Sequence, residues 1–543
     1  MRGRQQFVRK IVYLAVLAGL LLPLSWLSQP ASVDASGAPQ AGGKLAQLRD
    51  DYSLSQARLG DIDPVSETMK LATLGMRGPA ANLLWSKALY YQKVKDFTSL
   101  SATLEQITKL QPNFIRVWIF QGWNLSYNVS VEFDDYRDRY FWVIRGIRFT
   151  QEGLEYNRDE PTLLREVGRV ISRKMGQSDE HVQFRKLFRA DDDFHGSTAM
   201  AERDSWLVGK RWFERCVEVI KSTGRQPKGT SEGGEASPLM YLSEAPLCQL
   251  YYAATIEEEG TFGEAARAAW AEAQHDWEAY GEHDIPIGNE LTVKLGEANY
   301  RFYIDRVNDL ARQLDEAAPG ARERLLAEKQ ASLTPEETAL LEMPVSQRTE
   351  AQHALAAKVY PKLFVTHVDV ANSLPAGEQR NKALQLAASL TNYEVWKSEV
   401  EFHRTTVNYG YWQLRAEAEQ EPEALAAHEL IYQAQQAHRE VELEKAAKLY
   451  AAGFQKWAEL LDKTVKGEKK YARLVDDGIT GDQMVADIRK YRACLKQLDA
   501  PFPEDFPLAE TLRLHDQSQL TQPASDRSEQ STQAKEDATP EAG

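Results

Sequence analysis

The hydrophobic residues of this chain recur at helical spacing along most of its length. In residues 84–127 they fall on one face of each of two predicted helices, which Pro112 separates. In the second of these helices, Trp118, Gly122 and Leu125 share one face, because positions four and seven residues further on lie over the first. A glycine on such a face lets a neighbouring helix approach closely. The pattern therefore predicts pairs of helices that pack against each other.

The same pattern gives little support for a sheet, because no run of alternating β-branched residues is long enough to predict one. Helix starts are marked instead. Thr334 precedes Pro335 and Glu337, which suit the cap, first and third positions of one helix, and Thr349 with Gln352 marks another. The predicted fold class is all-α.

The repeated positions resemble those of the tetratricopeptide-repeat (TPR) family. The resemblance covers residues 81–195, 247–280 and 427–460, which together make up less than half of the chain. It implies TPR-like helical-hairpin repeats in a superhelical array with irregular helical insertions, and a concave face that binds a partner. The residues assigned to packing within these repeats are Ala88, Tyr91, Pro112, Trp118, Gly122, Leu125, Gly168, Ala254, Ala266, Trp270 and Ala273.

Three runs also resemble exported helical-repeat proteins of planctomycete-type bacteria. They are LATLGMRGPAANLLW at 71–85, QITKLQPNF at 106–114 and NVSVEFDDYRDRYFW at 128–142. No assigned activity accompanies this resemblance. It therefore implies export and a repeat architecture, and it implies nothing about chemistry.

The residues at the amino terminus predict export independently of this resemblance. Four basic residues between Arg2 and Lys10 precede an apolar run over 11–24, a pattern typical of a secretory signal. The run is shorter than the roughly 20 residues of a membrane-spanning helix. No strong cleavage site follows, so two alternatives stay open: a cleaved signal peptide, or an uncleaved membrane tether through residues 11–27. Both place the body in the periplasm or cell envelope, because the basic residues stay inside, and the second alternative anchors it in the inner membrane.

Composition narrows the classes of function. The 543 residues carry a formal net charge of −15, and the sequence shows no basic stretch, so we expect no nucleic-acid partner. The three cysteines, Cys216, Cys248 and Cys494, are too widely spaced for a disulfide framework or a metal-ligand pattern. We expect three buried, inert thiols, and a Cys216–Cys248 bridge is the alternative if the chain is exported.

Changes of pattern along the chain predict eight segments. They are a signal peptide or membrane anchor (1–27), a flexible linker (28–62), amino-terminal TPR-like repeats (63–195), a helix plus a disordered loop insertion (196–246), a TPR-like repeat and a long helix (247–315), a helical region (316–426), carboxy-terminal TPR-like helices (427–500) and a disordered tail (501–543).

Two acidic clusters are candidates for chemistry. The run from Asp191 to His195 offers carboxylates and an imidazole to a divalent cation, but a solvated turn explains it equally well. Carboxylates and arginines alternate around Asp134, where acid–base work would need burial. No phosphate-binding glycine loop and no hydrolase or zinc-protease motif occurs. His403, His428 and His438 are predicted to be surface residues.

Residues 128–140 interrupt the second predicted repeat with an acidic and aromatic insertion that stacking does not require. Its partner-binding candidates are Phe133, Asp134, Asp135, Tyr136, Arg137 and Tyr140. The leading hypothesis is a non-enzymatic exported scaffold, without cofactor or metal, that binds a protein or peptide. The alternatives are an envelope hydrolase or metal-dependent enzyme at Asp134 or Asp191, and a self-assembling structural component of the envelope. The oligomeric state is not predicted.

Overall fold

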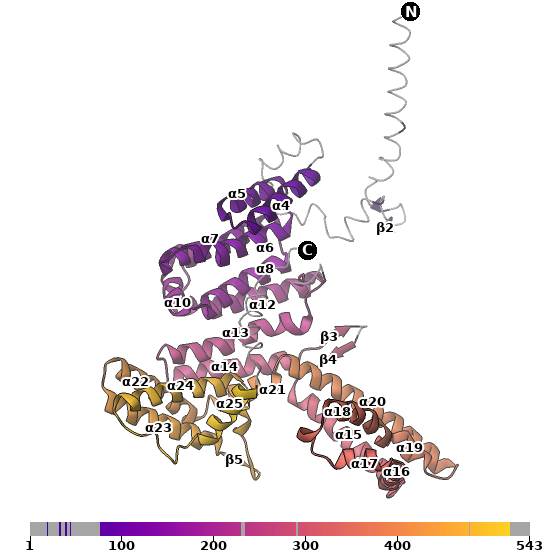
Figure 1. The fold of residues 1–543 in the computed structure, drawn as a ribbon. Coiled ribbons are helices and arrows are strands. Elements are labelled where there is room, and N and C mark those ends of the chain that lie inside the picture. The colour runs from indigo at the N-terminus through magenta and orange to yellow at the C-terminus, as the bar shows by residue number, and fades with distance from the viewer. Residues whose placement is uncertain are drawn as a thin grey trace, which may run out of the picture. The chain divides into compact units, whose positions relative to one another are not determined.

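A computed structural model describes residues 77–229, 234–288, 291–476 and 478–521, together with isolated pieces at 19, 32–33, 39–40 and 44. The described residues are mostly helical, so the all-α prediction is confirmed (Figure 1). The chain divides into two compact units on either side of the bond between Ala236 and Ser237. Unit 1 precedes this bond, and unit 2 follows it.

Unit 1 is built from α-helices of 9 to 21 residues, with shorter helical segments between some of them. Its elements are the strand pair β1 (Ser32–Val33) and β2 (Pro39–Gln40), then α4 (Arg77–Lys93), α5 (Phe97–Leu110), α6 (Ile115–Trp123), the π-helix η2 (Asn124–Val129), the 3-10 helix η3 (Ser130–Glu132), α7 (Tyr136–Tyr156), α8 (Pro161–Arg169), the π-helix η4 (Val170–Lys174), α9 (Met175–Gln177), α10 (His181–Ala190), α11 (Asp192–His195), the 3-10 helix η5 (Met200–Glu202) and α12 (Ser205–Thr223).

Helices α4 and α5 form one packed pair, and α6 and α7 form the next. Their boundaries follow from the sequence. The Asp96 carboxylate accepts a hydrogen bond from the Ser99 amide at the start of α5, and Asp135 caps α7 in the same way through the Arg137 amide. The side chains of Leu100, Leu104 and Ile107 on α5 are fully buried against α4.

Glycines bring α6 and α7 into close contact. A Cβ atom built at Gly122 would lie 2.0 Å from Thr150 Oγ1 and 3.1 Å from the carbonyl oxygen of Gly146. A Cβ built at Gly146 would lie 2.5 Å from the carbonyl oxygen of Gly122. The expectation that Gly122 permits a close helix approach is therefore confirmed, and Gly146 is its partner on α7.

The third pair differs from the expected one. Helical spacing predicts a third repeat that opens around Gly168 and continues with Phe184, but the principal partner of α8 is α12. A Cβ at Gly168 would lie 3.0 Å from the ring of Phe213 on α12. Helix α10, which carries Phe184, packs on α9 and α7 instead. Helical spacing alone identifies a packing face, and it does not say which later helix covers that face.

The described part of unit 2 consists mainly of helices, with short strand pairs between some of them. Its elements are α13 (Pro238–Glu258), α14 (Glu264–Gly281), β3 (Ile285–Gly288), β4 (Leu291–Val293), α15 (Glu297–Ala317), α16 (Ala321–Ala331), α17 (Pro335–Glu342), the 3-10 helix η6 (Val345–Gln347), α18 (Glu350–Leu363), α19 (His367–Asn372), α20 (Glu378–Thr406), α21 (Tyr409–Ala418), α22 (Pro422–Arg439), α23 (Leu443–Leu461), β5 (Thr464–Val465), β6 (Glu468–Lys469), the 3-10 helix η7 (Ala472–Val475), α24 (Gly478–Gln497) and α25 (Ala509–Thr521).

The main core of unit 2 lies among α13, α14 and the helices from α21 onward. Helices α13 and α14 form one packed pair, α22 and α23 form another, and α13 also contacts α22. Trp270 and Trp277 on α14 and Tyr450 and Phe454 on α23 are fully buried in this core. The core therefore joins the middle of the sequence to its carboxy-terminal part.

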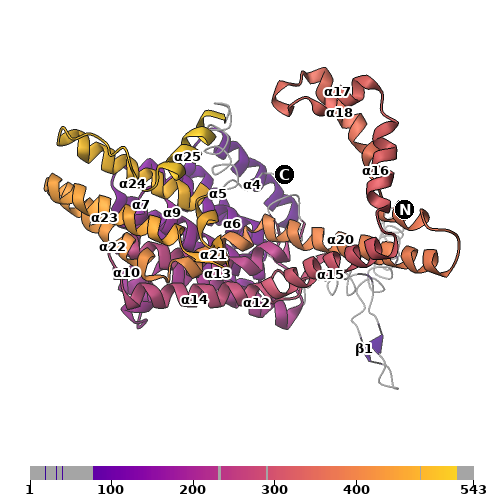
Figure 2. The same cartoon turned by 90° about the horizontal axis from the view of Figure 1, so that it is seen from below.

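Residues 297–406 form a second, smaller core within unit 2. Helices α15 and α20 run side by side, as Figure 2 shows, with α19 packed on both. Leu310, Leu314 and Leu390 are buried where these helices meet. The Thr334–Glu337 and Thr349–Gln352 capping boxes predicted from the sequence are both present at the starts of α17 and α18.

The repeat-packing residues are buried, with three exceptions. Tyr91, Pro112 and Ala254 are only partly buried; Ala253, next to the last of these, is fully buried. The buried members of the predicted set are Ala88, Trp118, Gly122, Leu125, Gly168, Ala266, Trp270 and Ala273.

Two segments predicted to be disordered are ordered where the structure describes them. In the loop insertion, Lys228 pairs with Glu235 across an antiparallel bridge, and the Lys228 amide donates to Thr162 Oγ1. In the predicted tail, Phe506 and Leu508 are buried and residues 509–521 form α25. A few apolar residues are enough to anchor a short polar segment to a core that other helices supply. Residues 522–543 lie outside the described part.

Short strands are a further difference from the sequence prediction. Strands β3 and β4 pair antiparallel, as do β5 and β6. The first of these hairpins precedes the long helix predicted within residues 247–315, and this helix begins at Glu297. Among the described residues, no helix is long and apolar enough to cross a membrane. The predicted signal or anchor (1–27) and most of the predicted linker (28–62) lie outside those residues.

Candidate functional site

The predicted insertion at 128–140 is mostly helical. Helix α6 continues through η2 and η3 to Glu132, and α7 begins at Tyr136. The extra residues therefore lengthen both helices, and only residues 133–135 form a loop between them. A π-helical turn accommodates an added residue within a helix without breaking it.

The six partner-binding candidates separate into two groups. The Phe133 ring stacks on Trp142, and the Tyr140 hydroxyl donates to Asp191 Oδ2 at 2.7 Å. Both of these side chains therefore make contacts within unit 1. Asp134, Asp135 and Arg137 are exposed, with Tyr136 half-buried beneath the Arg137 guanidinium. Two other apolar residues in this region, Val131 and Phe141, are 50% and 61% exposed.

The acidic run at 191–195 is explained by contacts within the protein. Asp191 caps the short helix α11 through the Phe194 amide, and Asp192 pairs with Arg203 at 2.6 Å. The His195 ring lies 2.8 Å from the Phe188 carbonyl oxygen and packs edge-on against the ring of Phe188. Burial lowers the pKa of His195 below its ordinary value. These side chains point to different partners and do not converge on a cation.

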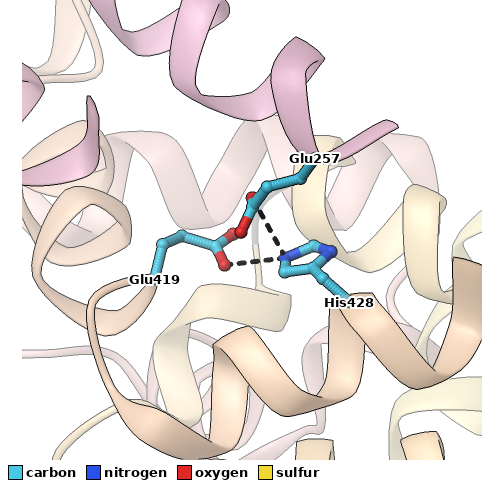
Figure 3. A group of neighbouring side chains, drawn as sticks. All are labelled: Glu257, Glu419 and His428. Atoms are coloured by element: carbon cyan, nitrogen blue, oxygen red, sulfur yellow. Dashed lines mark hydrogen bonds and ion pairs between the residues drawn. The ribbon is translucent and has the colours of Figure 1, made fainter. Parts of the chain in front are cut away.

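A different cluster, which the sequence did not indicate, lies inside unit 2. It consists of Glu257 at the end of α13, Glu419 just after α21, and His428 in α22 (Figure 3). In the described part of the chain, these are the residues of metal-ligating type that gather in a group of three. The contact between α13 and α22 brings Glu257 to the other two.

The cluster is tightly arranged. His428 Nε2 lies 2.8 Å from Glu419 Oε2 and 3.9 Å from Glu257 Oε2. The side chains of Glu257 and Glu419 are 2% and 3% exposed, and that of His428 is 15% exposed. Figure 3 shows the two carboxylates close to each other, with the imidazole beside both. The imidazole is thus the part of the cluster that solvent reaches.

Surrounding side chains hold the two carboxylates in place. Trp270 Nε1 donates to Glu257 Oε2 at 3.0 Å, and Arg415 Nε lies 3.4 Å from Glu419 Oε1. The Arg415 guanidinium lies over the rings of Trp270 and Trp412. Trp457 packs edge-on against the His428 ring. The two carboxylates therefore lie beside Arg415 and His428, and the side chains of Trp270, Trp412 and Trp457 surround this group.

Burial and charge shift the titration of each member. Burial raises the pKa of Glu257 to about 7, and the negative charge of Glu419 adds to this effect. Burial alone would lower the pKa of His428, but Glu257 and Glu419 together raise that pKa to about 9. Burial would raise the pKa of Glu419, yet the charges and hydrogen bonds of His428 and Arg415 hold it below its ordinary value. At neutral pH these shifts favour an imidazolium at His428, paired with Glu419, and they favour the protonated form of Glu257 more than in an exposed carboxyl.

We expect Glu257→Gln to remove a pH-dependent loss of stability. A carboxyl whose pKa is raised on folding holds its proton more tightly in the folded state, so stability falls as pH rises from 4.5 to about 7. At 1.36 kcal/mol per pKa unit, the loss over this window approaches about 3 kcal/mol. Chemical denaturation of wild type and variant at intervals from pH 4.5 to 7.5 measures it.

Glu264→Gln is the matched control, because Glu264 lies on the surface of α14 in an ion pair with Arg267. Its stability should follow that of the wild type across the same window. The free energy of unfolding of Glu257→Gln should instead increase relative to that of the wild type as the pH rises. Parallel curves for all three proteins would show that Glu257 titrates as an ordinary exposed carboxyl.

The sequence carries only a weak signal for this cluster. Glu257 lies three residues after Ala254, one of the predicted repeat-packing residues, and its sequence neighbourhood contains no ligand motif. His428 was expected on the surface, and this prediction is wrong because its ring lies between Glu419 and Trp457. Glu419, just after α21, and His428, in α22, are nine residues apart, a spacing that matches no known ligand motif.

No protein-family model matches this chain, and no curated protein matches its sequence. The class that the structure defines is therefore a structural one, a two-unit protein of packed helix pairs with a buried carboxylate–imidazole cluster.

Proposed function

We propose that this chain is a non-enzymatic helical-hairpin scaffold, exported to the cell envelope, that binds a protein or peptide. The observation that carries the proposal is the succession of packed helix pairs: α4 with α5, α6 with α7, α13 with α14, and α22 with α23. Each pair buries one face against its neighbours and leaves its turns and outer faces for a partner, as in TPR-like arrays.

The most favourable binding surface is the turn that joins the two helices of the second pair, α6 and α7. It presents the charges of Asp134, Asp135 and Arg137 beside the exposed apolar side chains of Val131 and Phe141. Large apolar side chains exposed next to charged groups are typical of protein-interaction sites. The net charge of −15 favours a partner with a basic surface, because opposite charges steer association.

Affinity capture with the full-length chain tests this surface. The variant Asp134→Lys, Arg137→Glu, Phe141→Ser changes three side chains on it and leaves the capping residue Asp135 in place. We expect the wild type to retain a stoichiometric partner from envelope extracts that the variant loses by at least tenfold, and we expect binding to weaken with added salt.

The control is the charge-swapped variant Arg312→Glu, Glu316→Lys, which reverses an exposed ion pair on α15. It should retain the same partner as the wild type. A partner retained equally by all three proteins would place the binding surface elsewhere. Recovery of only further copies of this chain would instead support the self-assembling alternative.

A further inference from the structure

The Glu257–Glu419–His428 cluster has an unsatisfied oxygen. Glu257 Oε2 accepts from Trp270, but Glu257 Oε1 is buried and has no hydrogen-bond partner among the residues that the structure describes. A buried carboxylate oxygen without a partner is costly, and native proteins rarely leave one unless a proton, water or ion occupies the place beside it. The Glu257 carboxylate, which already accepts from Trp270 through Oε2, can therefore interact with one more partner through Oε1.

We propose that Glu257, Glu419 and His428 bind a single Zn²⁺ ion. Each residue offers one ligand atom, and the three atoms lie within 4.8 Å of one another. Ligand atoms held at about 2.0 Å in a tetrahedron around Zn²⁺ lie about 3.3 Å apart. The distances from His428 Nε2, 2.8 Å to Glu419 Oε2 and 3.9 Å to Glu257 Oε2, fall on either side of that value. Small side-chain shifts complete the site.

The choice of ion follows from the donor set. An imidazole nitrogen with two carboxylate oxygens suits zinc and its neighbours, whereas Mg²⁺ and Ca²⁺ prefer oxygen donors alone. Trp270 and Arg415 hold the two carboxylates from behind, as outer-sphere groups do in zinc sites. The positive charge of Arg415 opposes the ion, and the two carboxylates offset it. Three protein ligands leave one position for water.

Zinc and a proton compete for His428. The imidazole must lose its proton before Nε2 can bind the ion, and a protonated Glu257 must lose its proton too, so ion binding releases protons. The partly exposed edge of the ring gives that proton and the ion a route to solvent. The apparent affinity for Zn²⁺ should therefore rise as the pH rises.

The test is isothermal titration of the full-length chain, purified without a polyhistidine tag and freed of metal with a chelator. Wild type should bind one Zn²⁺ per chain, far more tightly than Mg²⁺, and Co²⁺ in its place should give a tetrahedral visible spectrum. His428→Gln and Glu257→Gln should each weaken Zn²⁺ binding by at least roughly tenfold. His438→Gln, on the same helix α22, should leave it unchanged.

Several results would overturn the proposal. They are the absence of stoichiometric Zn²⁺ binding by the wild type, an equal effect of His438→Gln and His428→Gln, and Co²⁺ bound only with an octahedral spectrum, as for adventitious surface sites. Circular dichroism checks that each variant folds. If His428→Gln does not fold, Glu257→Gln decides, because its amide oxygen can still accept from Trp270.

Discussion

Replacing Gly146 with alanine should destabilise unit 1 by about 3 kcal/mol, in the upper part of the range for overpacking. The added Cβ would lie 2.5 Å from the carbonyl oxygen of Gly122 and 2.2 Å from Ser126 Oγ. The Ser126 side chain can rotate, but the backbone of α6 can move away only if the α6–α7 contact opens. Chemical denaturation, followed by circular dichroism, measures the loss.

Gly122→Ala in α6 provides a comparison at the same contact. Its Cβ would lie 2.0 Å from Thr150 Oγ1, a side-chain atom, and 3.1 Å from the nearest backbone atom. Removing the hydroxyl with Thr150→Ala should therefore recover much of the stability that Gly122→Ala loses. Ser126→Ala should recover little of what Gly146→Ala loses. Equal recovery in the two pairs would show that the backbones of α6 and α7 are not as close as this packing requires.

A control for glycine substitution in general is Gly78→Ala in α4. No described atom lies within 4 Å of a Cβ built there. Alanine in an open helical position should be neutral or stabilise by up to about 1 kcal/mol, because alanine has the higher helix propensity. A loss of stability in this variant comparable to that of Gly146→Ala would remove close packing as the explanation.

Local sequence patterns predicted the helices well. The face formed by Trp118, Gly122 and Leu125 is buried against α7, and the capping sequences at Thr334 and Thr349 begin helices as expected. Spacing and caps are properties of a single helix, so they can be read from consecutive residues. The partner of Gly168 on α12 could not be read in this way, because it depends on which distant helix returns to cover α8.

The candidate site was missed for a related reason. Glu257 and His428 face each other because α13 contacts α22, and nothing near either residue in sequence indicates that contact. A charged residue on an amphipathic helix is most often a surface residue, and His428 was placed there. Conversely, the run from Asp191 to His195 looked like a ligand set, yet its members cap a helix and pair with Arg203. Adjacent acidic residues point in different directions on a helix or turn, so residues that are neighbours in the sequence do not converge on one point in the structure.

Replacing Arg415 with methionine should have the largest effect in unit 2, a loss of about 3–5 kcal/mol. The Arg415 side chain is 6% exposed, bonds to Glu419, and also donates to the Tyr411 hydroxyl at 3.3 Å and to Gln483 Oε1 at 3.4 Å. Methionine keeps most of the length and apolar contact and removes the charge and the donors. Arg267→Met, which breaks an exposed pair with Glu264, should cost less than about 1 kcal/mol.

Charge balance makes the reason for this loss testable. With Glu257 ionised, the two carboxylates are matched by Arg415 and the His428 imidazolium; without Arg415, one buried negative charge is left over. Adding Glu257→Gln to Arg415→Met removes that excess and should recover part of the stability above pH 7. At pH 5, where Glu257 holds its proton, the rescue should be small. If the double variant is no more stable than Arg415→Met at pH 8, Arg415 stabilises unit 2 through its contacts with Trp270 and Trp412, and its charge is secondary.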